Sequence, residues 1–312
     1  MVNKLIIIIF FIPLFSSQWY FDDNNYWKFN TSSKDSALGG ISLNKFPCLS
    51  DNKYDNDKIR IYNSNIYDQL INYNNLFYSR NIFNVDFLGN SLYKINFSFF
   101  NRKLDNIIGT SEIWNDEINA PLNPSDINSS LIDNYTHNDF SFLVECFFKN
   151  NLGYFGLHIM PSISKIDTYS SKGLNLDLSY SKKINNLFLG FSFNNIFSYK
   201  KWNNSSVERF YPSVMFLLRR EFKSTDFFIE IDNWYLTNKN KIGDKVKLGI
   251  EYKLNSKSNI RFGYNSKFLA MGLGLNLYDK ILFDYSFLNH SDLGNSNQIT
   301  VIFLIQKKEK KR

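Results

Sequence analysis

Apolar and polar side chains alternate along most of the chain, most regularly in the segments 173–181, 244–254 and 280–288. A period of two places successive side chains on opposite faces of a β-strand. Almost no helical pattern lies between these runs, so the chain is predicted to be all-β. The alternation predicts fourteen strands, which lie at 58–62, 81–88, 92–101, 139–149, 152–162, 173–181, 187–198, 208–221, 226–236, 244–254, 259–266, 269–277, 280–288 and 297–305.

The connections between these runs are predicted to alternate between short and long. The short ones lie at 150–151, 182–186, 222–225, 255–258 and 278–279, and the longer ones at 163–172, 199–207, 237–243 and 289–296, with 265–268 as a short exception. Bacterial outer-membrane barrels have short periplasmic turns, longer external loops and an even number of strands. We therefore predict a single transmembrane antiparallel β-barrel of about 14 strands. Twelve or sixteen stay open, because the first strand is short.

The two faces of each strand differ in charge. In the segment 244–254, apolar residues such as Val246 share one face, and the other face carries charges. Ile229, Val246 and Ile281 are therefore predicted to face lipid. A charged side chain on the lipid face costs roughly 2–4 kcal/mol near the midplane, so the charged face is predicted to line the lumen. Opposite charges on adjacent strands stabilise each other. The predicted ladder comprises Glu230, Asp232, Lys245, Lys247, Glu251, Arg261 and Asp284. It could line a polar pathway or brace the lumen with ion pairs, and we favour bracing.

The ends of the chain differ from its middle. Residues 1–18 have the basic start and short apolar run of a secretory signal peptide, although a buried first strand is an alternative. Residues 19–56 are polar and irregular, and we expect them to form an N-terminal plug or hatch. The barrel is predicted to span 57–306, with a long extracellular loop at 102–138 that lacks any period. A basic tail, 307–312, follows.

Composition narrows the classes of function. Most of the net charge of +7 comes from the tail and the leader, so we expect no nucleic-acid partner. The mean hydropathy of −0.30 excludes a helical membrane bundle. Cys48 and Cys146 are too few for a disulfide scaffold, and a bridge between them stays open. The three histidines lack metal-ligand spacing, and no catalytic or nucleotide-binding motif occurs. We therefore expect no enzyme, no metal and no cofactor.

Several short segments carry a family resemblance in the order in which they occur. They are Ser36–Ser42 (SALGGIS), 173–178 (GLNLDL), 193–196 (FNNI), 208–218 (ERFYPSVMFLL), 249–252 (GIEY), 261–264 (RFGY) and 284–287 (DYSF). In these segments the chain resembles the PorV/PorQ family of outer-membrane proteins, relatives of the FadL-type barrels. It departs from that family by lacking an Asn-Pro-Ala segment after the N-terminal signature and by ending in a basic tail. The resemblance implies a fourteen-stranded barrel in a Gram-negative outer membrane.

Three hypotheses of function follow. The first is an outer-membrane barrel linked to type IX secretion or acting as a surface scaffold, as the resemblance implies, with outer-membrane lipid and secretion-system proteins as partners. The second is a FadL-like channel for small hydrophobic compounds, which needs an apolar pocket or lateral opening lined by residues such as Phe188 and Trp234. The third is a secreted soluble β-sandwich that binds surface ligands.

Overall fold

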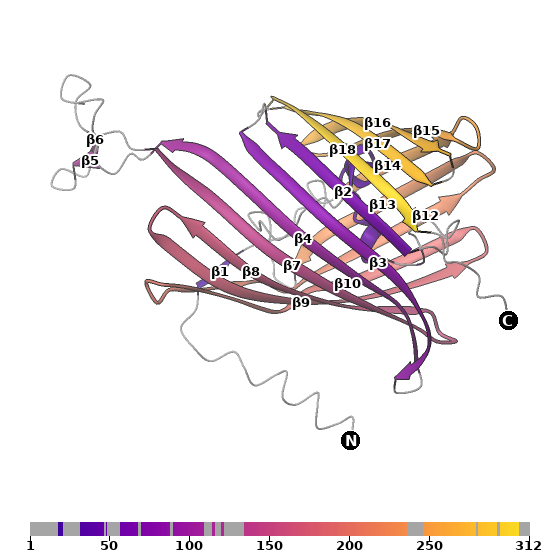
Figure 1. Cartoon of the computed structure of the whole chain (residues 1–312), viewed down its shortest axis with the longest axis horizontal. Coiled ribbons are helices and arrows are strands. Elements are labelled where there is room, and N and C mark those ends of the chain that lie inside the picture. Colours follow the sequence, from indigo (N-terminus) through magenta and orange to yellow (C-terminus); the bar gives the residue numbers. More distant parts are fainter. Residues whose placement is uncertain are drawn as a thin grey trace.

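The protein is a closed antiparallel barrel (Figure 1). The computed structural model describes residues 18–20, 32–46, 48, 57–67, 70–87, 90–108, 114–115, 120–121, 134–235, 246–278, 280–291 and 294–305. Fourteen described strands form the wall: β2 (Asp57–Ile66), β3 (Ile71–Phe87), β4 (Asn90–Ile108), β7 (Asn134–Lys149), β8 (Tyr154–Ile166), β9 (Tyr169–Ile184), β10 (Leu187–Trp202), β12 (Ser213–Glu221), β13 (Thr225–Tyr235), β14 (Val246–Lys253), β15 (Ser258–Asn265), β16 (Phe268–Leu277), β17 (Ile281–His290) and β18 (Gly294–Ile305). The predicted fold class is confirmed.

The sheet closes because each wall strand pairs with the next and β18 pairs with β2. Asp57 lies opposite Ile305, so the first and last strands begin and end at the same rim. By the bacterial pattern this is the periplasmic rim. A sheet closed on itself has no second sheet to pack against, so the β-sandwich alternative is wrong.

Several predicted loops are in fact strand. β4 continues to Ile108 and β7 starts at Asn134, so both ends of the predicted 102–138 loop belong to the wall. A register shift between Leu104 and Ile107, with Asn106 at a φ of 57°, breaks the alternation there. Between these strands, β5 (Trp114–Asn115) and β6 (Ala120–Pro121) pair with each other. The register shift near Asn106 is a bulge, and beyond a bulge the side chains exchange faces of the sheet. The alternation of apolar and polar residues is therefore lost at the end of β4.

The predicted alternation of short and long connections is also wrong in part. The segment 163–172 contains only a two-residue turn between β8 and β9, with Asp167 in the left-handed region. The segments 199–207 and 289–296 are likewise partly strand, and so is most of the stretch at 64–80, between the first two predicted strands. Strand ends beyond the membrane face water, so polar residues there do not mark the end of a strand.

The outer face of the wall is apolar. Ile229 is 44% exposed, whereas its neighbour Glu230 is fully buried, as predicted from their parity. Val246 and Ile281, also predicted to face lipid, are half-buried. The exposed side chains include Phe97, Phe99, Phe142, Leu178, Phe216, Leu248, Ile250, Phe262, Leu273 and Ile299. An apolar outer band with charges inside is the arrangement of a barrel that lipid surrounds. Within the described residues, no helix has the length and apolarity needed to cross a membrane.

An arginine introduced on this outer face tests the assignment. Ile250 lies in the middle of β14 and is paired with Phe262 and Phe227. We expect I250R to lower the free energy of unfolding by about 2–4 kcal/mol, because lipid cannot solvate the charge. The matched control is L254R at the periplasmic turn, expected to cost about 0–1 kcal/mol. Urea unfolding of the barrel in lipid vesicles measures both, and equal losses would contradict the assignment.

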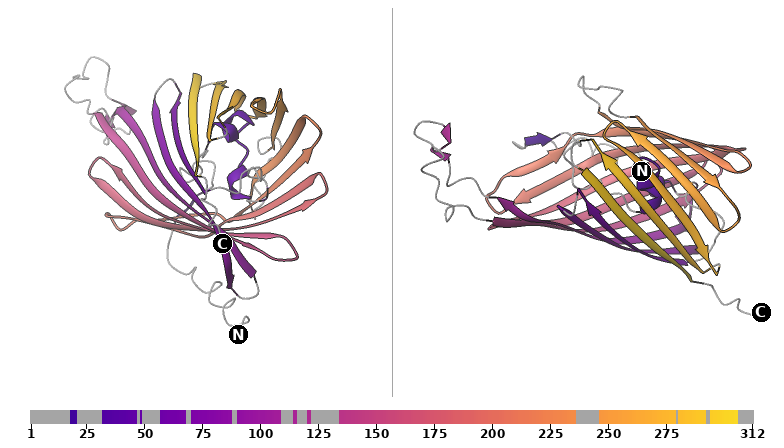
Figure 2. Two further views of the ribbon diagram at one scale, coloured as in Figure 1. Left: turned by 45° about the vertical axis from the view of Figure 1, so that its right-hand side comes forward. Right: turned by 90° about the horizontal axis from the view of Figure 1, so that it is seen from above.

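Residues 32–46 of the N-terminal region lie within the ring of strands (Figure 2). They contain α2 (Ser33–Ala37) and the 3₁₀ turn η2 (Leu43–Lys45). We call residues 32–46 the inner segment. The rest of the predicted 19–56 plug, apart from Gln18–Tyr20 (β1) and Cys48, lies outside the described residues. So do residues 1–17 of the predicted signal peptide and the tail at 307–312. β1 pairs in parallel with β11 (Val207–Phe210).

Candidate functional site: the lumen and its inner segment

The inner segment turns sharply where two glycines follow α2. Ser32 caps the helix, since its hydroxyl accepts a hydrogen bond from the Asp35 amide at 3.2 Å. Gly39 and Gly40 then have φ values of 84° and 81°, a left-handed conformation that glycine adopts without a steric penalty. These two residues are the centre of the SALGGIS segment. Its glycines are therefore required by the turn that returns the chain toward β14.

Glycines of the wall leave room for this turn. A Cβ atom on Gly263 of β15 would overlap the backbone of Leu38 and Gly39. A Cβ atom on its cross-strand neighbour Gly249 would lie 2.9 Å from the Leu38 carbonyl oxygen. The backbone of the inner segment therefore packs directly on the backbone of the wall. Because atoms are in contact here, a water-filled path cannot pass between these two surfaces.

Lys247 joins the inner segment to two acids of the neighbouring strand. Its Nζ lies 2.7 Å from Glu230 Oε1 and 2.9 Å from Asp232 Oδ2. The same ammonium donates to the Gly40 carbonyl oxygen at 2.9 Å, and Glu230 accepts a hydrogen bond from the Ser42 amide at 2.7 Å. Glu230 and Lys247 are cross-strand partners, so the strand register brings them together. The wall thus holds the inner segment by charge-assisted hydrogen bonds.

Arg261 connects strands that are not adjacent. It donates to Glu251 on β14 and to Asp284 on β17, and Lys34 of α2 approaches Glu251 at 3.3 Å. β16 lies between Arg261 and Asp284, and its residue at this level is Gly274. A Cβ atom there would lie 2.5 Å from an Arg261 nitrogen. The missing side chain lets the guanidinium reach across β16.

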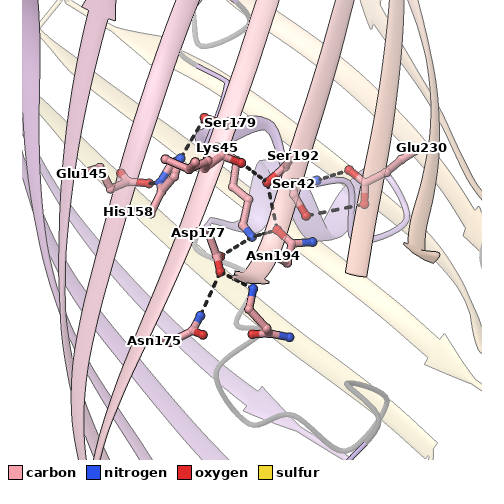
Figure 3. Close-up of polar contacts among 12 residues, drawn as sticks. Ser42, Lys45, Glu145, His158, Asn175, Asp177, Ser179, Ser192, Asn194 and Glu230 are labelled. Carbon is pink, nitrogen blue, oxygen red and sulfur yellow. Dashed lines mark hydrogen bonds and ion pairs between the residues drawn. The ribbon is translucent and has the colours of Figure 1, made fainter. Parts of the chain in front are cut away.

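A second anchor joins the inner segment to β9 and β10. Lys45 Nζ lies 2.9 Å from Asp177 Oδ2 and 2.6 Å from Asn194 Oδ1 (Figure 3). The other Asp177 oxygen accepts from the Asn195 amide at 2.8 Å. Asn195 has a φ of 56° and lies in the register shift of β10. The bulge therefore aims a backbone donor at the carboxylate that holds Lys45.

The structure places the predicted ladder as follows. Glu230, Asp232, Glu251, Arg261 and Asp284 are buried on the inner face, and Lys247 is paired with two of these acids. Lys245 lies outside the described residues. The alternation of polarity did not reveal the partners that the inner segment supplies, because Lys34, Ser42 and Lys45 lie in a region without a period. Arg60 was also missed, although its parity between Ile59 and Ile61 already placed it inside.

Ser179, His158 and Glu145 form a hydrogen-bonded chain that resembles a catalytic triad. The Ser179 hydroxyl lies 2.8 Å from His158 Nε2, and His158 Nδ1 lies 2.9 Å from Glu145 (Figure 3). A Cβ atom on Gly156 would meet both the serine oxygen and the Phe147 ring. Ser179 is buried within a paired strand, so its oxygen has no room for a substrate. The chain of bonds is therefore better suited to bracing three strands than to catalysis.

An apolar cluster surrounds the end of the inner segment. Phe188, predicted to line a hydrophobic pocket, is buried in this cluster with Phe46 and Cys48. The side chain of Trp234 lies outside the described ones. Burial raises the pKa of the Cys48 thiol, and Cys146 lies on the outward parity of β7. Both thiols are free, so the bridge that had stayed open between them is absent. Among the described residues, no group of three or more His, Cys, Asp or Glu could hold a metal ion.

Solved structures of bacterial channels share this fold. A deltaS2 mutant of TodX, described as a monoaromatic hydrocarbon channel, superposes with a TM-score of 0.51 at 11% identity, covering 88% of this chain and 98% of the other. TodX of Pseudomonas putida, described as a toluene transporter, gives 0.50 at 10% identity, covering 86% and 95%. The alignment with the KdgM porin covers 80% of this chain and 99% of the porin at 9% identity. Its TM-score of 0.35 is too low to indicate a shared fold.

No protein-family model matches the chain, and neither does any curated protein. The likeness to TodX therefore concerns the fold alone. It agrees with the closed fourteen-strand wall, the apolar outer band and the charged interior described above. A closed wall with an apolar outer band needs apolar surroundings, which a lipid bilayer supplies. The chain is an outer-membrane β-barrel of the bacterial kind.

Proposed function

We propose that this protein is a barrel of the PorV/PorQ type whose inner segment closes the lumen, and that it serves secretion or surface scaffolding instead of passive diffusion. The observation that carries the proposal is the direct backbone contact between Gly39 and Gly263, supported by the Lys45–Asp177 ion pair and by the hydrogen bonds of Lys247 and Glu230 to the inner segment. A scaffold needs a rigid barrel, whereas a general pore needs a continuous water-filled path.

The strength of this closure supports the proposal. The Lys45–Asp177 ion pair holds the inner segment to β9, and the wall residues Lys247 and Glu230 hold it by hydrogen bonds with Gly40 and Ser42. Removing one partner of a buried ion pair typically costs about 3–5 kcal/mol, because the other charge stays buried and uncompensated. Displacing the segment would break the Lys45–Asp177 pair and the hydrogen bonds that join Lys247 to Gly40 and Ser42 to Glu230. A spontaneously open state is therefore expected to be rare.

Conductance tests the closure. The purified full-length barrel, inserted in a planar lipid bilayer, is expected to show no stable ion-conducting steps, because the segment blocks the lumen. A general porin inserted under the same conditions serves as the positive control. Stable steps from the wild-type barrel, at low voltage and in the absence of denaturant, would contradict a closed lumen.

Deleting the gene in the bacterium that encodes it tests the secretion role. We expect proteins bearing type IX secretion signals to accumulate in the periplasm and to disappear from the cell surface, as measured by mass spectrometry of both fractions. Restoring the wild-type gene is the control. Unchanged surface proteins after deletion would contradict the role in secretion and leave the closed barrel as a scaffold.

A second candidate is a channel for small hydrophobic compounds. It is favoured by the superposition on TodX and by the apolar cluster that Phe46 and Phe188 form inside the barrel. The cluster offers an apolar surface once the inner segment moves. Uptake of a radiolabelled monoaromatic hydrocarbon into cells with and without the protein tests this candidate. Equal uptake would rule it out.

A further inference from the structure

A cavity of about 240 Å³ lies between the inner segment and the wall near the periplasmic rim. It is lined by the start of β2, the end of β14 and the exposed turn residues 255–257, so it opens at that rim. Seven basic and three acidic side chains line it among the described residues. The positive excess inside a low-dielectric wall attracts anions.

Arg60 is a buried basic residue in the lining of this cavity. Only 5% of its surface is exposed, and the Phe77 ring lies 4.1 Å from the guanidinium carbon. Its Nη1 donates to the Asn44 side-chain oxygen of η2 at 2.9 Å, and the Asn44 amide nitrogen in turn donates to Asp35. One edge and one face of the guanidinium are therefore held, which fixes its orientation.

The other edge of Arg60 is unsatisfied. Its Nε and Nη2 atoms are buried and have no hydrogen-bond partner. These two nitrogens form the side-on fork that binds two oxygens of one carboxylate or phosphate group. Buried donors without a partner cost free energy, typically about 1–3 kcal/mol and more for charged groups. An orphaned charged fork in the wall of a basic cavity is the feature expected of an anion site.

Asn96 supplies a complementary acceptor in the same cavity. Its Nδ2 donates to Glu145 at 2.8 Å, while its side-chain oxygen is buried and unpartnered. A ligand with both an oxyanion and a hydroxyl group could accept from Arg60 and donate to Asn96. Monoprotonated phosphate and hydroxycarboxylates have both groups.

We propose that this periplasmic cavity binds a small oxyanion, a phosphate or a hydroxycarboxylate, through the Nε–Nη2 edge of Arg60. Arg261, by contrast, is already paired with Glu251 and Asp284 and does not take part in binding. Because Arg60 also holds Asn44 of the inner segment, the bound anion would contact the same side chain that fixes that segment.

Isothermal titration of the full-length barrel in detergent tests the site, with inorganic phosphate and citrate as separate probes at constant ionic strength. We expect saturable binding of at least one anion to the wild type, weakened about tenfold or more in R60K, which keeps the charge but loses the fork. The control R220K changes an arginine on the outward-facing parity of β12, outside the cavity, and is expected to bind like the wild type.

A second measurement covers the case in which R60K fails to fold, as judged by heat-modifiable gel migration. Phosphate or citrate is then expected to raise the urea midpoint of the wild type relative to chloride at equal ionic strength, because a ligand of the native state stabilises it. Nanodiscs with phosphatidic acid in place of phosphatidylcholine test a lipid headgroup as the source of the same anion. No binding of any of these probes, or equal binding by wild type and R60K, would overturn the proposal.

Discussion

G263L is expected to expel the inner segment from the lumen. The leucine side chain would occupy the volume that the backbone of Leu38 and Gly39 fills, and a backbone cannot move aside as a flexible side chain can. The wall strand itself is undisturbed, because its pairing partners on β14 and β16 are unchanged. We therefore expect a folded barrel with an emptied constriction. This is the largest functional change that a single substitution in the described residues should produce.

Cys48 reports this displacement directly. Cys48 is 3% exposed, and burial raises the pKa of its thiol, so the native barrel should react slowly with a maleimide. In a C146S background, G263L is expected to increase the rate of Cys48 labelling about tenfold or more and to produce stable conductance steps in planar bilayers. The matched control is F262L, which places the same new side chain, leucine, on the outward face of the same strand, where Phe262 is exposed. Slow labelling and silent bilayers in G263L would show that the segment does not close the lumen.

R261M is expected to cause the largest loss of stability. The substitution leaves the carboxylates of Glu251 and Asp284 buried without their shared partner. Unpaired buried charges typically cost about 3–5 kcal/mol. Urea unfolding in lipid vesicles, followed by gel mobility, measures the loss as a lower midpoint.

The triple variant E251Q/R261M/D284N separates charge from shape. It removes the uncompensated charges, so we expect it to recover a large part of the stability that R261M loses. R220M, which alters an exposed arginine, is expected to change the free energy of unfolding by less than about 0.5 kcal/mol. If R261M were as stable as R220M, the ion pairs that cross β16 would not brace the barrel.

The alternation along single strands was a reliable guide because it is a local property. In β13 and β14 it separated the outward Ile229 from the inward Glu230 and Lys247, and it found all fourteen wall strands. The alternation failed where the wall bulges, at Asn106, because one extra residue exchanges the two faces. It also failed at the rims, where strand residues meet water on both faces.

The lumen could be predicted only in part. The parity of Glu251, Arg261 and Asp284 placed them inside, but it could not show that Arg261 crosses β16 above Gly274 to reach β17. The role of Lys45 was hidden as well, since no period exists in its segment and its partner Asp177 is 132 residues away. Contacts between a segment without a period and a distant wall depend on how the barrel closes.

The sequence by itself determined the class of the fold and the two faces of its strands, because each depends on the chemistry of near neighbours. Tertiary structure alone decided the register that pairs Glu230 with Lys247, the seating of Gly39 on Gly263 and the cavity around Arg60. The last two of these features join segments more than 200 residues apart in the chain. Only closure of the barrel brings them within hydrogen-bonding distance.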